Sequence, residues 1–128
     1  MSKIVIADSS CLIALSKIGR LNVLQQLFQQ ILIVPAVFKE VVTLGANRPG
    51  AMEVQNANWI EVVEVKDELT VNALKVHLGE GESQTITLAV ECSANYIIID
   101  DWQARQTALD MSLTVIGTIA VLKKAFEI

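Results

Sequence analysis

Residues 96–105 run from an apolar segment through two carboxylates into a helix-like stretch, Tyr-Ile-Ile-Ile-Asp-Asp-Trp-Gln-Ala-Arg. A short, β-branched apolar run of this kind is typical of a strand that is buried on both faces of a parallel sheet. In open α/β sheets, ligands bind where the strands reach their carboxyl ends. The segment therefore predicts a parallel sheet with a functional edge at Asp100 and Asp101.

The rest of the chain repeats this alternation of strand and helix. Apolar runs predict strands at residues 3–7, 31–34, 59–65, 96–100 and 113–116, of which 59–65 alternates partly, as an edge strand does. Helices are predicted at residues 10–18, 21–28, from Pro35 onward, 52–57, 67–77, 79–93, 101–111 and 118–126, with Ser9 or Ser10 as the first N-cap. Residues 45–50 are predicted to form a loop, a candidate flap or substrate contact.

This order predicts an α/β fold, a three-layer α/β/α sandwich around a mostly parallel central sheet with right-handed crossovers. The length suits a single domain over residues 1–128. Apolar residues make up 52% of the chain and aromatic residues only 5%, so we expect a core of Ile, Val, Leu and Ala.

Charge and cysteine content limit the classes of function. The net charge of −4 argues against sequence-independent binding of nucleic acid without excluding it, because such proteins usually carry a basic patch. Cys11 and Cys92 are expected to be reduced thiols, and with His77 as the single histidine a zinc site is not expected. No signal peptide is visible and no apolar run reaches the roughly 20 residues that span a bilayer. We expect a soluble, cytoplasmic protein without membrane contact.

Three further acids come from distant parts of the chain. Asp8 follows the first strand and Glu40 lies one turn into the helix after the second, so both are expected at the edge of Asp100 and Asp101. Glu82 lies in the first turn of the helix before the fourth strand. A simple crossover helix antiparallel to the strands is expected to begin at the opposite edge. Glu82 then joins the other acids only if the preceding glycine-rich loop lies on the functional edge.

If these acids meet, they form a site for a hard divalent cation. Mg²⁺ and Mn²⁺ take oxygen ligands, and carboxylates are their usual source in proteins. Carboxylates that crowd together without a metal repel one another. One or two such ions can activate water and stabilise the leaving oxygen of a phosphodiester, and Ser10 could add a hydroxyl contact.

Each acid also has an ordinary structural explanation. Asp8 can cap a helix, Glu40 can be a solvated surface residue, and Glu82 suits the positive end of a helix dipole. Either member of the aspartate pair can cap the next helix, and Asp101 can pair with Arg105 four residues later. The metal site is therefore inferred from the whole set of acids and from no single one.

Basic and aromatic residues give weaker indications. Lys39 and Arg48, near the predicted loop, could contact phosphate, although isolated basic residues usually face solvent. Trp102 is a better candidate for base stacking than Trp59, because it lies next to the acids.

Five segments in order, at residues 4–15, 34–41, 79–89, 97–105 and 113–118, resemble PIN domains. Among their motifs are Ile-Ala-Asp-Ser-Ser, Val-Pro-Ala-Val-Phe-Lys-Glu, Gly-Glu-Gly-Glu-Ser and Ile-Ile-Ile-Asp-Asp. The chain is most similar to a prokaryotic branch of predicted nucleic-acid-binding PIN proteins related to VapC-type toxins. The resemblance implies a ribonuclease fold dependent on Mg²⁺ or Mn²⁺. The implied catalytic and metal-binding acids are Asp8, Glu40, Glu82, Asp100 and Asp101, with Ser10 in support and one of the two aspartates as the ligand.

Three functional hypotheses are consistent with the sequence. The first is a nuclease in which a metal-bound water cuts an RNA phosphodiester and leaves a 3′-hydroxyl and a 5′-phosphate. The second is a toxin with the same chemistry, held silent by an antitoxin, whose apolar 21–28 helix serves a homodimer or an antitoxin groove. The third is a PIN-like module that binds metal or protein without cleavage, which the acidic charge and the short last helix favour. A response-regulator-like domain does not fit, because its paired acids should follow the first strand.

Overall fold

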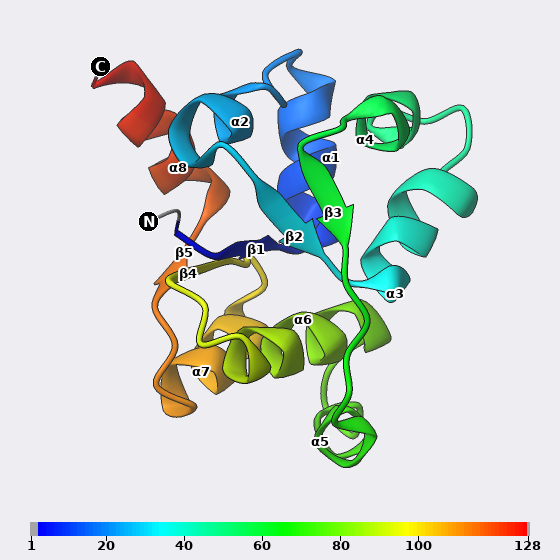
Figure 1. Ribbon diagram of the computed structural model, residues 1–128, viewed down its shortest axis with the longest axis vertical. Helices are drawn as coiled ribbons and strands as arrows, with labels where there is room; N and C mark the ends of the chain where they lie inside the picture. The colour runs from blue at the N-terminus through cyan, green and yellow to red at the C-terminus, as the bar shows by residue number, and fades with distance from the viewer. Residues whose placement is uncertain (1–2, 128) are drawn as a thin grey trace.

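The structure is a computed structural model that describes residues 3–127, and its centre is a five-stranded, fully parallel sheet (Figure 1). The strand order is β3-β2-β1-β4-β5. The strands are β1 (Val5–Ala7), β2 (Ile31–Ile33), β3 (Ile60–Val62), β4 (Tyr96–Ile98) and β5 (Val115–Ile116). β3 lies at one edge of the sheet, as its partly alternating sequence predicts.

Helices cover both faces of the sheet and complete three layers (Figure 1). Helices α1, α2 and α8 pack together on one face, and α6 and α7 lie on the other. The helices are α1 (Ser9–Lys17), α2 (Val23–Phe28), α3 (Pro35–Phe38), α4 (Ala51–Asn56), α5 (Glu68–Leu74), α6 (Glu80–Glu91), α7 (Trp102–Asp110) and α8 (Thr118–Phe126), with a π-helical segment η1 (Lys39–Thr43) after α3. Among the described helices, none has the length and apolar character that crossing a bilayer requires.

The three-layer α/β/α fold predicted from the sequence is confirmed, with three local differences. The strands are shorter than predicted, because the predicted runs extend beyond the paired residues at one end or at both. Neither Ser9 nor Ser10 is the N-cap of α1, because the helix begins at Ser9 and Asp8 takes that position. The helix that begins at Pro35 changes to π-helical geometry at Lys39, which the apolar spacing does not reveal.

The register of β1 and β4 makes the two strands end side by side at the carboxyl edge of the sheet. Ala7 pairs with Ile98, and the next N–H, that of Asp8, donates to the carbonyl of Ile98 at 3.0 Å. The residues at this end of the strands are fully buried, Ala7 and Ile98 among them. The buried sheet thus delivers Asp8 and the aspartates after β4 to one place, as the parallel topology predicts.

Candidate metal centre

Five acidic side chains line one pocket of about 470 Å³ at the carboxyl edge of the sheet. They are Asp8, Glu40, Glu82, Asp100 and Asp101. The remaining lining residues are small, namely Ser9, Ser10, Gly79 and Gly81. All five acids that the sequence predicts for the site, and also Ser10, therefore lie around one pocket.

Asp8 is the buried member of this set. Its side chain is only 3% exposed, makes no helix-capping hydrogen bond, and leaves Oδ1 without a hydrogen-bond partner among residues 3–127. Burial raises the pKa of Asp8 from 3.8 to about 7, against a smaller lowering by the N–H of Ser9. The carboxylates of Glu82, Glu40 and Asp100 add to the increase. A buried acid with an unpartnered oxygen, facing other acids, is costly unless a cation joins it.

Glu40 reaches the pocket from the π-helical segment η1. Its Oε2 accepts a hydrogen bond from the hydroxyl of Ser9 at 2.9 Å. Its Oε1 lies against Gly81, where a Cβ atom would collide with it. A π-helical turn inserts one extra residue and turns the residues after it around the axis, and such turns are frequent at functional sites. We infer that η1 and Gly81 together set the position of this carboxylate.

Glu82 lies on the same edge as the other acids, so the expectation that a simple crossover helix begins at the opposite edge was wrong. In a parallel sheet the chain leaves each strand at its carboxyl end, so a crossover helix begins at that edge and runs back. Figure 1 shows α6 beginning near α3 and returning toward β4. The Gly79 N–H donates to Glu82 Oε1 at 3.2 Å, and burial, followed by the charges of Asp101 and Glu40, raises the pKa of Glu82.

The structure separates the roles of the two adjacent aspartates. Asp100 accepts hydrogen bonds from Thr118, at 2.8 Å from its N–H and also from its hydroxyl. Asp101 is the N-cap of α7 and accepts from the N–H of Ala104 at 3.0 Å. The alternative in which Asp101 pairs with Arg105 is not realised, because Lys75–Glu80 is the only ion pair within residues 3–127. Arg105 donates instead to the carbonyl of Ile99 at 3.2 Å.

Sequence reasoning missed the residues that hold these acids. The sequence alone indicates only a helix cap at Ser9 and only parts of a motif at Gly117 and Thr118. Gly117 leaves room for Asp100 and the Arg105 guanidinium, both of which a Cβ atom would crowd. The available signal was the Gly-Thr pair directly after the last strand, since hydroxyls at helix starts often bind nearby polar groups.

The carboxylates of the pocket are ligands that suit Mg²⁺ or Mn²⁺, but in this structure their side chains do not point to one common metal position. Among residues 3–127, no three His, Cys, Asp or Glu side chains are gathered into a group that could hold a metal ion as they stand. Glu40, Glu82, Asp100 and Asp101 each accept hydrogen bonds from the protein instead. The free, buried Oδ1 of Asp8 is the observation that fits a cation. Hard oxygen ligands with no thiol or imidazole among the lining residues match these ions.

Replacing Gly81 with alanine tests whether Glu40 belongs to a metal site. The added methyl group takes the place of the Glu40 carboxylate, while alanine favours the helix by up to about 1 kcal/mol over glycine. We expect undiminished thermal stability without metal and a roughly 10–100-fold loss of Mn²⁺ affinity. Thermal shift with and without Mn²⁺ measures both, with Glu40→Gln for comparison. Unchanged Mn²⁺ affinity in both variants would exclude Glu40 from the site.

The pocket also explains the acidity of the chain. Five of the fourteen acidic residues line it, so the rest of the sequence carries nine acidic against ten basic residues. The surface beyond the pocket is therefore close to neutral. The net charge of −4 reflects the pocket and gives no reason to reject an anionic ligand.

Comparisons with known proteins agree with this geometry. A family model, DUF3368, described as a PIN domain, matches residues 4–127. The crystal structure of PAE2754 from Pyrobaculum aerophilum is similar, with a TM-score of 0.65, 14% identity and coverage of 100% of each chain. At that identity the likeness concerns the fold alone. No curated protein matches the sequence.

Proposed function

Because the chain belongs to the PIN domain family, whose members are generally nucleases, we propose that it is a divalent-metal-dependent ribonuclease. The bonds it cuts are RNA phosphodiesters, and its cofactor is Mg²⁺ or Mn²⁺. The observation that carries the proposal is the buried, unpartnered carboxylate oxygen of Asp8 among four other acids in one pocket.

In this proposal, four acids of the pocket bind the cation, and neighbouring residues position two of these acids through hydrogen bonds. Asp8, Glu40, Glu82 and Asp100 are the ligands, and Asp101 stays the cap of α7. When bound, such an ion activates water and stabilises the leaving oxygen of a phosphodiester. Hydroxyl groups keep two ligands near their places, since the Ser9 hydroxyl donates to Glu40 and the Thr118 hydroxyl donates to Asp100.

The chain also offers a stacking surface for a nucleobase next to the acids. Trp102 begins α7, directly after Asp101, and is 73% exposed. Trp59 instead is partly buried against the hydrophobic core, so it offers less of its ring to a base than Trp102 does. Stacking on an exposed aromatic ring contributes about 1–3 kcal/mol per base, and single-stranded RNA supplies unstacked bases. Trp102 therefore favours a single-stranded substrate.

Cleavage of labelled single-stranded RNA tests the proposal directly. We expect cleavage with Mg²⁺ or Mn²⁺, none with a chelator, and products with 5′-phosphate and 3′-hydroxyl ends. Cleavage that persists in the chelator would contradict the proposal. Metal binding without cleavage of any RNA would support the alternative, a catalytically weak or inactive PIN-like module that binds metal or protein.

Replacing Asp100 and Asp101 with asparagine, one at a time, tests which of them is the metal ligand and which only caps α7. Asparagine caps a helix about as well as aspartate, so Asp101→Asn is expected to leave both thermal stability and Mn²⁺ affinity nearly unchanged. Asp100→Asn removes a proposed ligand and is expected to lower Mn²⁺ affinity at least roughly tenfold. Calorimetric titration of both variants decides the matter. The opposite ranking would make Asp101 the ligand.

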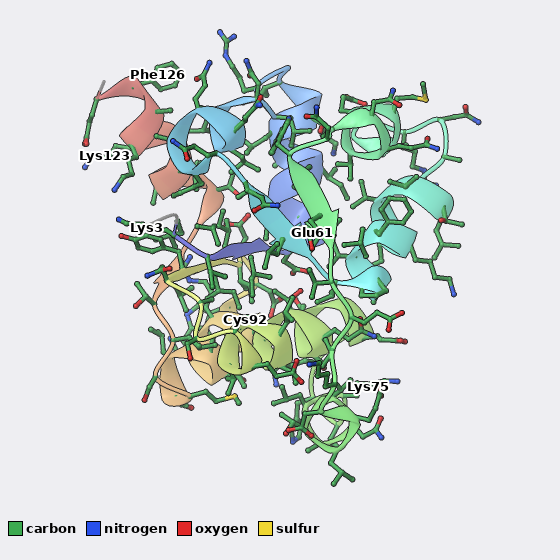
Figure 2. All side chains as sticks on the ribbon, viewed as in Figure 1. Lys3, Glu61, Lys75, Cys92, Lys123 and Phe126 are labelled. Atoms are coloured by element: carbon green, nitrogen blue, oxygen red, sulfur yellow. The ribbon has the colours of Figure 1, made fainter. Side chains whose placement is uncertain are left out.

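A toxin role with an antitoxin partner, or a homodimer, requires an apolar surface. The 21–28 segment does not supply it, because Leu24 and Phe28 of α2 are buried in the core. Helix α8 exposes Ile119 and Phe126 instead, at 78% and 74%. Figure 2 shows Phe126 near the end of this helix. We propose that any such partner uses α8. Growth arrest on expression, relieved by a co-expressed neighbouring gene, is the expected sign of a toxin.

A further inference from the structure

A second groove neighbours the acidic pocket and shares the lining residue Glu40 with it. Its volume is about 280 Å³, and it lies between α1 and the segment that contains η1 and the following loop. It is lined by Ile13, Lys17, Glu40, Val41, Leu44, Gly45, Arg48 and Pro49. Because Glu40 borders both spaces, they are neighbours, and a chain-like ligand bound at the acids can extend past Glu40 to reach this groove.

Helix α1 sets the direction of this path. The helix begins beside the acids at Ser9, and Ile13 and Lys17 follow at four-residue intervals, which places them on one face. A nine-residue helix is about 13 Å long, so Lys17 lies roughly that distance from the acidic pocket. The groove thus changes from an anionic end at Glu40 to a cationic end at Lys17.

The cationic end has two free positive charges over an apolar floor. Lys17 and Arg48 form no ion pair, since the part of the chain that the structure describes has a single one elsewhere. Val41 is buried beneath, whereas Leu44 is 68% exposed and open to a ligand. Cations beside an apolar surface are what a nucleotide requires, because its phosphate is anionic and its base is flat and poorly hydrated.

The loop that carries Arg48 is folded into a fixed shape. The Arg48 N–H donates to the carbonyl of Gly45 at 2.9 Å, and the Arg48 carbonyl accepts from the N–H of Ala51 at 3.2 Å. Gly45 packs against the carbonyl of Val41, where a Cβ atom would lie only 2.5 Å from the oxygen. These contacts hold the loop against η1, so the backbone that carries Arg48 has a defined position beside the groove.

We propose that this groove binds a nucleotide one or two positions away from the cleaved bond in a single-stranded RNA substrate. Its phosphate lies between Lys17 and Arg48, and its base packs against Leu44. The inference rests on the proposed function for its substrate class. It adds a second, separate set of residues that binds RNA without holding the metal.

Binding of labelled single-stranded RNA to the full chain tests this proposal without cleavage. Asp8→Asn serves as the background, and fluorescence anisotropy gives the affinity between about 50 and 200 mM salt. The test variant adds Lys17→Gln and Arg48→Gln. The matched control adds Lys123→Gln and Lys124→Gln, which remove the same charge from α8, where Figure 2 shows Lys123. A Leu44→Ala variant tests the apolar floor.

We expect the test variant to bind RNA roughly tenfold more weakly and to lower the slope of log affinity against log salt by about 0.7, because it loses its contacts with one phosphate. The control is expected to lose less than about twofold. Leu44→Ala should weaken binding without changing the salt slope, because it removes no charge. Equal losses in test and control, or no RNA binding by the background protein, would overturn the groove assignment.

The two proposals fail in different ways. If the wild-type protein cleaves RNA while the Lys17/Arg48 variant keeps its full affinity, the nuclease stands and the groove assignment is wrong. The wild-type protein could cleave no RNA while the test variant and the matched control still differ in RNA affinity as expected. In that case the groove binds RNA and the nuclease proposal is wrong. A groove that captures an acidic peptide in preference to RNA would also reject the assignment.

Discussion

Replacing Asp8 with asparagine is expected to reduce metal-dependent RNA cleavage by about 1,000-fold, or roughly 4 kcal/mol of transition-state stabilisation. Asp8 is the one acid buried against the core, and its Oδ1 atom has no other partner among the described residues. Asparagine has nearly the same shape but lacks the charge that a divalent cation requires. The loss should therefore appear in catalysis and not in folding.

A matched variant keeps this experiment specific. Asp110 is exposed at the end of α7 and does not line the pocket, so Asp110→Asn should cleave RNA at the wild-type rate. Circular dichroism should show the same secondary structure for both variants. Cleavage by Asp8→Asn within about tenfold of the wild-type rate would show that the pocket is not the catalytic site.

The metal-free protein is expected to lose stability as the pH rises from about 4 to about 7. Asp8 has a pKa of about 7 when folded against 3.8 as its ordinary value. Below pH 3.8 Asp8 is protonated in both the folded and the unfolded chain, so its ionisation does not affect the free energy of unfolding. Between the two values the unfolded chain releases the proton first, which favours unfolding. Above pH 7 the difference levels off at about 4 kcal/mol.

Urea denaturation in a chelator, at several pH values, measures this loss. Asp8→Asn should remove most of the pH dependence and should be more stable than the wild type at pH 8, because no buried charge must form. Burial and neighbouring acids also raise the pKa of Glu82, so part of the same trend should remain. Added Mn²⁺ should restore wild-type stability at pH 8 and leave Asp8→Asn unchanged. A wild type whose stability does not fall toward pH 8 would contradict the burial of Asp8.

The order of strands and helices was predictable because the chain is locally consistent. Short Ile- and Val-rich runs alternate with helical spacing, and such runs bury both faces only in a parallel sheet covered by helices. The placement of Asp8 and the aspartate pair followed from that sheet alone, since parallel strands end at one edge. The metal role of these acids remains a prediction from the set and from the family.

Other features depend on tertiary contacts that no local pattern encodes. The π-helical turn at Glu40 has the same apolar spacing as an α-helix, and the hydroxyl of Ser9 is equally suited to capping or to binding a carboxylate. Asp100 and Asp101 are identical in type and adjacent, so only their contacts with Thr118 and Ala104 separate them. Glu82 was predictable in principle, because a crossover helix begins where the preceding strand ends.

Calorimetric titration of Mn²⁺ into the metal-free protein tests the central claim most directly. The wild type and Asp110→Asn are expected to bind Mn²⁺ with the same affinity, whereas Asp8→Asn is expected to show no saturable binding in the same range. The acids of the pocket would then form a divalent cation site in solution. Absence of binding by the wild type, or equal binding by all three proteins, would contradict the claim.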